Sequence, residues 1–147
     1  MIDYRYLKSV QLGLCCFVLF LLSASTVYGD HSELSHNHVL LLNSYHQGMT
    51  WVDQLTSAVK QKFQTEHSNT IIHVENMDTK RNPSSQYSDF LRELYQLKFA
   101  KNQFDLILAS DNNAYDILRK YGNDLFGDTP VVFCGVNDFK EEQITDY

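Results

Sequence analysis

Small polar residues follow three apolar runs of this sequence, at the point where each run ends. Hydroxyl groups, amides and the N–H groups at a helix start can bind a carboxylate or another polar head group. The flat rings of Tyr45 and Trp51 can add an apolar wall, and pockets for small molecules combine such walls with a few directed polar groups. We call the predicted ligand-binding set the strand-end site; it comprises Ser44, Tyr45, Trp51, Ser110, Asp111, Asn112, Gly135, Val136 and Asn137.

The elements that position these residues are predicted to alternate between strand and helix. The first strand is continuously apolar, which is typical of a parallel strand covered on both faces. This alternation predicts an α/β fold with a mostly parallel three-layer sheet and right-handed crossovers, in which ligands bind at the carboxyl ends of the strands. The strands are expected at His38–Ser44, Thr70–Val74, Phe104–Ala109 and Val131–Cys134, and the first two helices at Trp51–Thr65 and Ser84–Ala100.

Local signals set the expected helix boundaries. Thr50 with Asp53 forms a short capping box, and Asp138 with Glu141 forms another that predicts a further helix. Asp111 or Asn112 is expected to cap the third helix, and Gly122 to end it. The inner face of the second helix is expected to carry Tyr87, Phe90, Leu91, Leu94 and Leu97.

The amino terminus has the layout of a targeting segment. Arg5 and Lys8 precede an uncharged run from Ser9 to Gly29, which predicts a hydrophobic helix within residues 1–29. This segment is either a cleaved signal peptide or an uncleaved anchor in the inner membrane, since about 20 apolar residues span a bilayer. Basic residues before the run place the domain in the periplasm in both cases. We expect a linker at 30–37 and the folded domain at 38–147.

Composition narrows the classes of function. The net charge is −6 and no basic stripe is present, which argues against binding to nucleic acid. Cys134 is the only cysteine after the leader, and its apolar run predicts a small buried side chain. His31, His36 and His38 fit a solvated linker better than a metal site, because no acidic or sulfur ligand completes a set. We therefore predict neither a metal nor a cofactor.

Catalytic motifs are not found in this sequence. A hydrolase of a layered α/β fold would place its serine in G-x-S-x-G, whereas Ser110 stands in A-S-D-N. A glycine-rich phosphate loop is also missing. The only suggestive pair is Ser44 with His46. We predict no catalytic residue and keep a hydrolase-like enzyme as the least favoured alternative.

Four motifs in sequence order carry a resemblance to a known family: VLLLNSY, ENMDTKR, FDLILASDNNA and PVVFCGVNDF. Together they resemble the amino-terminal lobe of periplasmic sensor domains related to ABC-transporter substrate-binding proteins. Such domains are similar to type I periplasmic binding proteins and often precede transmembrane, PAS, histidine kinase or diguanylate cyclase modules in bacterial signalling proteins. The resemblance implies a non-catalytic sensor lobe that binds a small organic ligand, such as an amino-acid-like compound.

The family's binding unit has two lobes with the ligand between them, whereas this sequence supplies one lobe. It is expected to be either a fragment of a longer signalling protein or a shortened protein. The implied partners are a second lobe and an output module. The alternative is a periplasmic solute-binding component of an ABC transporter, whose partner would be a permease.

Overall fold

Strands and helices alternate along residues 36–140, which are the residues that the computed structural model describes. The expected hydrophobic helix within 1–29 and most of the expected linker lie outside this range, as does any helix after Lys140. The elements are β1 (Asn37–Asn43), α2 (Thr50–Glu66), β2 (Thr70–Asn76), α3 (Ser85–Lys98), β3 (Leu106–Ser110), α4 (Asp111–Phe126) and β4 (Val131–Cys134).

The four strands form one parallel sheet in the order β2-β1-β3-β4. This confirms the predicted α/β class and parallel sheet. Asn43 at the end of β1 is aligned with Asn76 on β2 and with Ser110 on β3, and Ser110 is in turn aligned with Cys134 on β4. The four carboxyl ends therefore lie in register, and the loops after them leave the sheet together.

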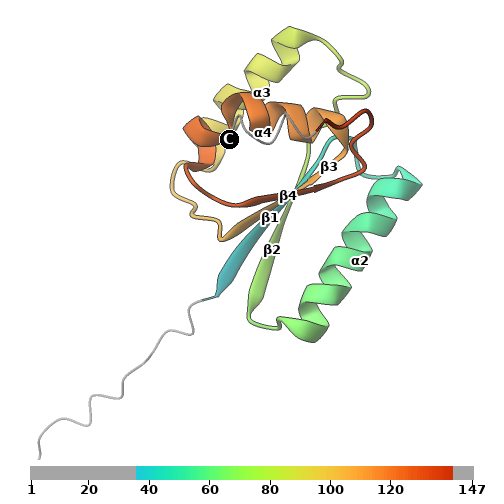
Figure 1. The fold of residues 1–147 in the computed structure, drawn as a ribbon, viewed down its shortest axis with the longest axis vertical. Coiled ribbons are helices and arrows are strands. Elements are labelled where there is room, and N and C mark those ends of the chain that lie inside the picture. The colour runs from blue at the N-terminus through green and yellow to red at the C-terminus, as the bar shows by residue number, and fades with distance from the viewer. Residues whose placement is uncertain (1–35, 141–147) are drawn as a thin grey trace, which may run out of the picture. The chain divides into compact units, whose positions relative to one another are not determined.

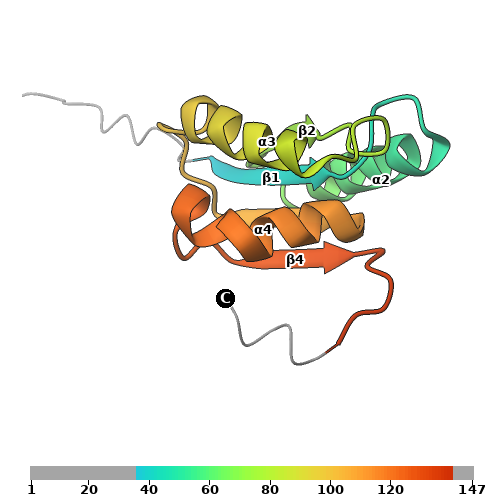
Figure 2. The same ribbon diagram turned by 90° about the horizontal axis from the view of Figure 1, so that it is seen from above.

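Helices cover both faces of the sheet. Figures 1 and 2 show α2 on one side of it and α3 with α4 on the other. Leu40 and Leu42 of β1 and Ile107 of β3 are fully buried and pack with residues of α3 and α4. Leu41 points to the opposite face of the strand and is buried as well. The expected burial of the first strand on both faces is thus confirmed.

The start of α2 differs from the prediction. Met49 occupies the N-cap position, and Thr50 is the first helical residue. The carboxylate of Asp53 accepts a hydrogen bond from the backbone N–H of Gly48 at 3.1 Å. The predicted Thr50 cap is therefore wrong, because the acidic side chain binds the loop before the helix.

The boundaries of α4 also require correction. Ser110 is its N-cap residue, so neither Asp111 nor Asn112 has the predicted capping position. The helix passes through Gly122 and ends at Gly127, which has φ 59°. Glycine adopts this left-handed backbone without steric cost, so Gly127 rather than Gly122 ends the helix.

The turn after β4 corrects one further boundary. Asp138 has φ 57°, whereas an N-cap residue has an extended backbone. The expected capping role of Asp138 is therefore wrong, and its partner Glu141 lies outside the described residues.

The inner face of α3 is rotated from the predicted one. The helix begins after Ser84, whose side chain accepts a hydrogen bond from the N–H of Tyr87, as expected for a start at this point. Leu91 and Tyr95 are buried, whereas Phe90 and Leu97 are 55% and 81% exposed. The buried residues of α3 are four positions apart, so the buried face of this helix includes aromatic side chains as well as leucines.

Cys134 is exposed, which contradicts the predicted burial. It lies on β4, one of the two edge strands of the sheet, where burial alternates along the chain. Val131 and Phe133 pack on the core, whereas Val132 is exposed on the same side as Cys134. An apolar run at the edge of a sheet is covered on one face only.

Candidate functional site

The loops after β1 and β3 are joined directly at the carboxyl ends of these strands. The backbone N–H of Ser44 donates to the carbonyl oxygen of Ser110 at 3.2 Å. The hydroxyl of Ser44 donates to the same oxygen at 2.6 Å and accepts from the N–H of Ala114 at 2.8 Å. One side chain therefore fixes the end of β1 to the end of β3 and to the first turn of α4.

Ser44 and Ser110 are both fully buried. The hydroxyl of Ser110 donates to Oδ1 of Asn43 at 3.0 Å, so it too is used within the protein. These two members of the strand-end site hold its backbone together. Their direct contact with a ligand stays a prediction that this geometry does not favour.

Asn43 is a structural residue of the site that the sequence analysis missed. Its amide nitrogen donates to Oγ1 of Thr56 at 3.2 Å and to Oδ1 of Asn76 at 3.0 Å. The side chain is fully buried and links β1 to α2 and β2. The sequence carried one signal for this role, which is the single amide side chain at the end of an unbroken apolar run. A polar group buried at that point needs hydrogen-bond partners.

Asp111 lies at the centre of the strand-end site. Its Oδ2 accepts a hydrogen bond of 2.9 Å from the indole Nε1 of Trp51, and the residue is only 9% exposed. Gly135 approaches from the β4 loop so closely that an added Cβ would lie 3.5 Å from Oδ1 of Asp111. The first turn of α2, the first residue of α4 and the loop after β4 thus meet at one carboxylate.

The charge of Asp111 extends to the neighbouring loops. Burial raises the pKa of the Tyr45 hydroxyl, and the negative charge of Asp111 raises this pKa further. The same two causes, in the same order, raise the pKa of the Cys134 thiol. Tyr45 and Cys134 belong to different strand ends, so both ends lie within the electrostatic field of Asp111.

Asn112 and Asn137 form a second link across the site. Nδ2 of Asn112 donates to the carbonyl oxygen of Asn137 at 3.1 Å, and the backbone N–H of Asn137 donates to Oδ1 of Asn112 at 3.0 Å. This pair of hydrogen bonds ties the β4 loop to the start of α4. Val136 lies partly buried within the tied loop.

The loop after β2 also reaches this end of the sheet, although the sequence analysis left it out of the site. Nδ1 of His46 lies 3.4 Å from Oδ1 of Asp78, and a guanidinium nitrogen of Arg81 lies 3.6 Å from Oδ2. The ammonium group of Lys80 lies over the Tyr45 ring, 5.5 Å from its centre. The contacts with His46 and Tyr45 could not be predicted from the charged run itself, because a whole helix and strand separate it from these two residues in the sequence.

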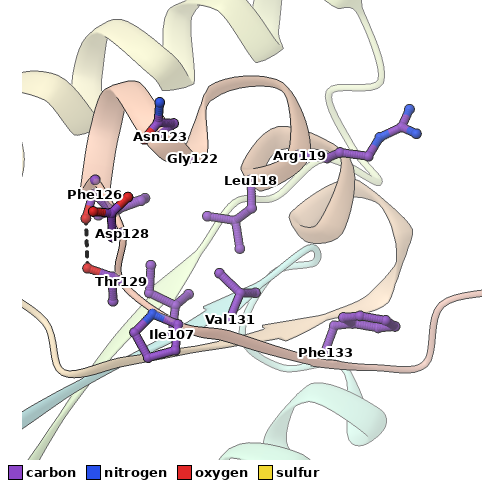
Figure 3. A pocket seen from close by; sticks show the side chains of 12 residues that line it. Ile107, Leu118, Arg119, Gly122, Asn123, Phe126, Asp128, Thr129, Val131 and Phe133 are labelled. Atoms are coloured by element: carbon purple, nitrogen blue, oxygen red, sulfur yellow. Dashed lines mark hydrogen bonds between the residues drawn. The ribbon is translucent and has the colours of Figure 1, made fainter. Parts of the chain in front are cut away.

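Three hollows in the described surface lie away from the strand-end site. One of about 800 Å³ lies beside α4 and β4, where Ile107, Leu118 and Val131 point into it (Figure 3). The second adjoins the start of β3, and the third lies between α2 and β2. None of the nine predicted residues lines any of these three hollows.

Metal-ligating residues do not gather in the described part of the chain, where no group of three or more could hold an ion. His38 and His73, on the adjacent strands β1 and β2, are joined through Nδ1 and Nε2 at 2.9 Å. His73 was predicted to be a satisfied residue of the sheet, and this contact confirms the prediction. His31 lies outside the described residues.

Comparisons with known proteins identify no relative of this chain. No protein-family model matches this chain, and no curated protein or solved structure is similar to it. Within residues 36–140, none of the helices is both long and apolar enough to span a bilayer. The function therefore has to be argued from the strand-end site and from the motifs of the sequence.

Proposed function

We propose that this chain is an extracytoplasmic lobe that binds a small organic ligand and belongs to a bacterial signalling protein. The observation that carries the proposal is the meeting of Trp51, Asp111 and Gly135, which come from the start of α2, the start of α4 and the loop after β4. In parallel α/β sheets, this position at the carboxyl ends of the strands is where ligands bind. The resemblance of the four motifs to periplasmic sensor domains is the reason for proposing a sensor.

A binding role fits the side-chain contacts better than a catalytic one. The hydroxyl of Ser44 is bonded to the backbone of Ser110 and Ala114, so its proton and lone pair are already used. His46 lies beside Asp78 instead of beside a serine. A nucleophile needs a base within hydrogen-bonding reach, and neither side chain offers that arrangement.

The exposed ring of Trp51 fits one half of a cleft. Trp51 is 47% exposed although its indole N–H is bonded to a nearly buried carboxylate. In the family that the sequence resembles, a second lobe closes over such a surface. We therefore expect the ligand to be enclosed fully only when that lobe is present.

Binding at this site is tested with the protein purified in the form that cells export. A panel of small amines, alcohols, carboxylates and amino acids is titrated while backbone amide NMR signals are followed. We expect shifts at Tyr45, Asn112 and Asn137 and none at Arg119 or Asn123, which line the hollow beside α4. Shifts confined to the hollow would contradict the proposed site.

A matched pair of variants sharpens this test. Asn112→Ala removes all three hydrogen bonds to Asn137 and should weaken binding about tenfold, because the loop that carries Asn137 is then no longer fixed beside the site. Asn113→Ala makes the same chemical change at the exposed neighbouring position and should leave affinity unchanged. Equal effects of the two would show that only the helix start had been disturbed.

The periplasmic location is tested by fractionating cells that produce the full chain. We expect the protein outside the cytoplasm, either released by osmotic shock or retained in the membrane after alkaline washing. Retention favours the anchored sensor, and release favours a soluble solute-binding component. Recovery in the cytoplasm would contradict both.

A further inference from the structure

The strand-end site carries a full negative charge on Asp111, and within residues 36–140 no cationic side chain forms an ion pair with it. Its hydrogen-bond donor is the neutral indole of Trp51, which satisfies one oxygen and leaves the charge in place. A nearly buried carboxylate without a counter-ion favours the approach of a cation.

The helix to which Asp111 belongs does not reverse this preference. The start of α4 carries a positive partial charge equivalent to about half an elementary charge. Asp111 carries a whole one, so the local sum stays negative. An anionic head group would therefore meet net repulsion at this position, despite the N–H groups of the helix start.

Aromatic rings beside Asp111 suit the same kind of ligand. The Lys80 ammonium lies 5.5 Å from the centre of the Tyr45 ring, so one ring of the site already accepts an ammonium group on its face. The Trp51 ring is half-exposed and is held in place by its bond to Asp111. Indole is the strongest partner for cations among the aromatic side chains.

The backbone of Asp111 shows that its position is imposed by the surrounding fold. Its φ of 67° lies in the left-handed region, which residues other than glycine rarely adopt. Such a conformation persists where neighbouring contacts fix it. Here the bond from Trp51 and the close approach of Gly135 hold the carboxylate between the start of α2, the start of α4 and the loop after β4.

We propose that the ligand of the strand-end site carries a primary ammonium group, which the carboxylate of Asp111 binds and the rings of Tyr45 and Trp51 cover. This inference rests on the proposed function and specifies the chemistry of its ligand. The ammonium group donates hydrogen bonds to the carboxylate, and the apolar remainder of the ligand lies against the rings. The Lys80 ammonium carries the same charge and competes for the Tyr45 face.

The test uses probes that share one alkyl frame and differ in charge. Butylamine, butan-1-ol and butyrate are titrated into the exported protein, and the NMR shifts of Tyr45, Asn112 and Asn137 are followed. We expect butylamine to bind at least tenfold more tightly than the other two. Tetramethylammonium, which lacks N–H donors, should bind more weakly than butylamine.

Two variants of the site and one control variant separate the charge of the site from its folding. Asp111→Asn should weaken butylamine binding at least tenfold, whereas Asp116→Asn, at an exposed position of the same helix, should leave it unchanged. Lys80→Gln removes the competing ammonium and should tighten butylamine binding several-fold. Lys80→Gln leaves Asp111 and its partners intact, so it still tests the ammonium inference if Asp111→Asn does not fold.

The outcomes separate this inference from the proposed function. Tighter binding of butyrate or butan-1-ol at the same residues would overturn the ammonium inference and leave the binding function standing. Weaker butylamine binding by Lys80→Gln would show that Lys80 helps to hold the ligand, and would also overturn it. Failure of every probe and of the wider panel to shift these residues would overturn both.

Discussion

Trp51 donates a hydrogen bond of 2.9 Å to Asp111, although the two residues are 60 positions apart in the sequence. The bond connects the first turn of α2 with the first residue of α4, which lie on opposite sides of the sheet (Figure 1). It therefore crosses the sheet at its carboxyl end. Any change in this bond acts on both helices and on the loop that contains Gly135.

Trp51→Phe keeps an aromatic ring and removes the N–H donor. We expect the free energy of unfolding to fall by about 1–2 kcal/mol, because the nearly buried carboxylate of Asp111 loses its hydrogen-bond donor and water replaces that donor only in part. Urea unfolding followed by circular dichroism measures the change. Phe90→Leu, at an exposed aromatic position of α3, is the control and should change stability by less than about 0.5 kcal/mol.

Ser44→Ala leaves the N–H of Ala114 without its buried acceptor. We expect a loss of about 1–3 kcal/mol in the free energy of unfolding, which is the usual cost of an unsatisfied buried polar group. Ser57→Ala changes an exposed serine of α2 and should be nearly neutral. Equal stability of the two variants would contradict the role assigned to Ser44.

Gly122 and Gly127 should respond in opposite directions to alanine. Gly122 lies inside α4, and an added Cβ would make only an ordinary contact of 3.8 Å with Leu118, so Gly122→Ala should stabilise by about 0.5–1 kcal/mol. Gly127 has φ 59°, so Gly127→Ala should destabilise by more than about 1 kcal/mol. Thermal melting of both variants checks this, and a shift of the same sign in both would place the end of α4 elsewhere.

Asn112→Ala should release the loop after β4 without loosening the strand. The N–H of Asn137 loses its acceptor, so its hydrogen exchange should become at least tenfold faster. The N–H groups of β4 should keep their protection, because the bonds between β3 and β4 are unchanged. Exchange followed by NMR measures both, with Asn113→Ala as the control.

Acid should weaken the fold through His73. Burial lowers the pKa of His73 below its ordinary value of 6.5, and His38 lowers it further. As the pH falls below about 6.5, the unfolded chain binds a proton that the folded chain resists, so the free energy of unfolding falls until the folded pKa is passed. His73→Gln should flatten this dependence, whereas His67→Gln, at an exposed histidine, should not. Urea unfolding between pH 5 and 8 compares the three proteins.

The fold could be predicted from sequence because apolar runs and helical periodicity are local signals. The end of β3 at Ser110 and the start of α3 after Ser84 are set by neighbouring residues, so these positions were found within a few residues. The exposure of Cys134 could not be found in this way. It depends on which strand lies outermost, and that order is a property of the whole sheet.

The sequence allowed the positions of the strand-end site to be predicted, but not the contacts between its side chains. Parallel pairing brings Ser44 and Ser110 together, so their proximity follows from the strand ends alone. The bond between Asp111 and Trp51 joins residues 60 positions apart, and the residues next to Asp111 carry no local signal for it.

The central position of β1 has a consequence for synthesis. The side chain of Asn43 is bonded to that of Ser110, 67 residues later in the chain. A ribosome therefore releases the middle strand of the sheet well before the partner that completes it. During that interval one side of β1 has no native neighbour, and a chaperone that holds the nascent chain extended has an apolar segment to bind. Translation beyond Ser110 supplies this neighbour, whereas the sheet and the strand-end site are complete only after β4 and Asn137 have followed.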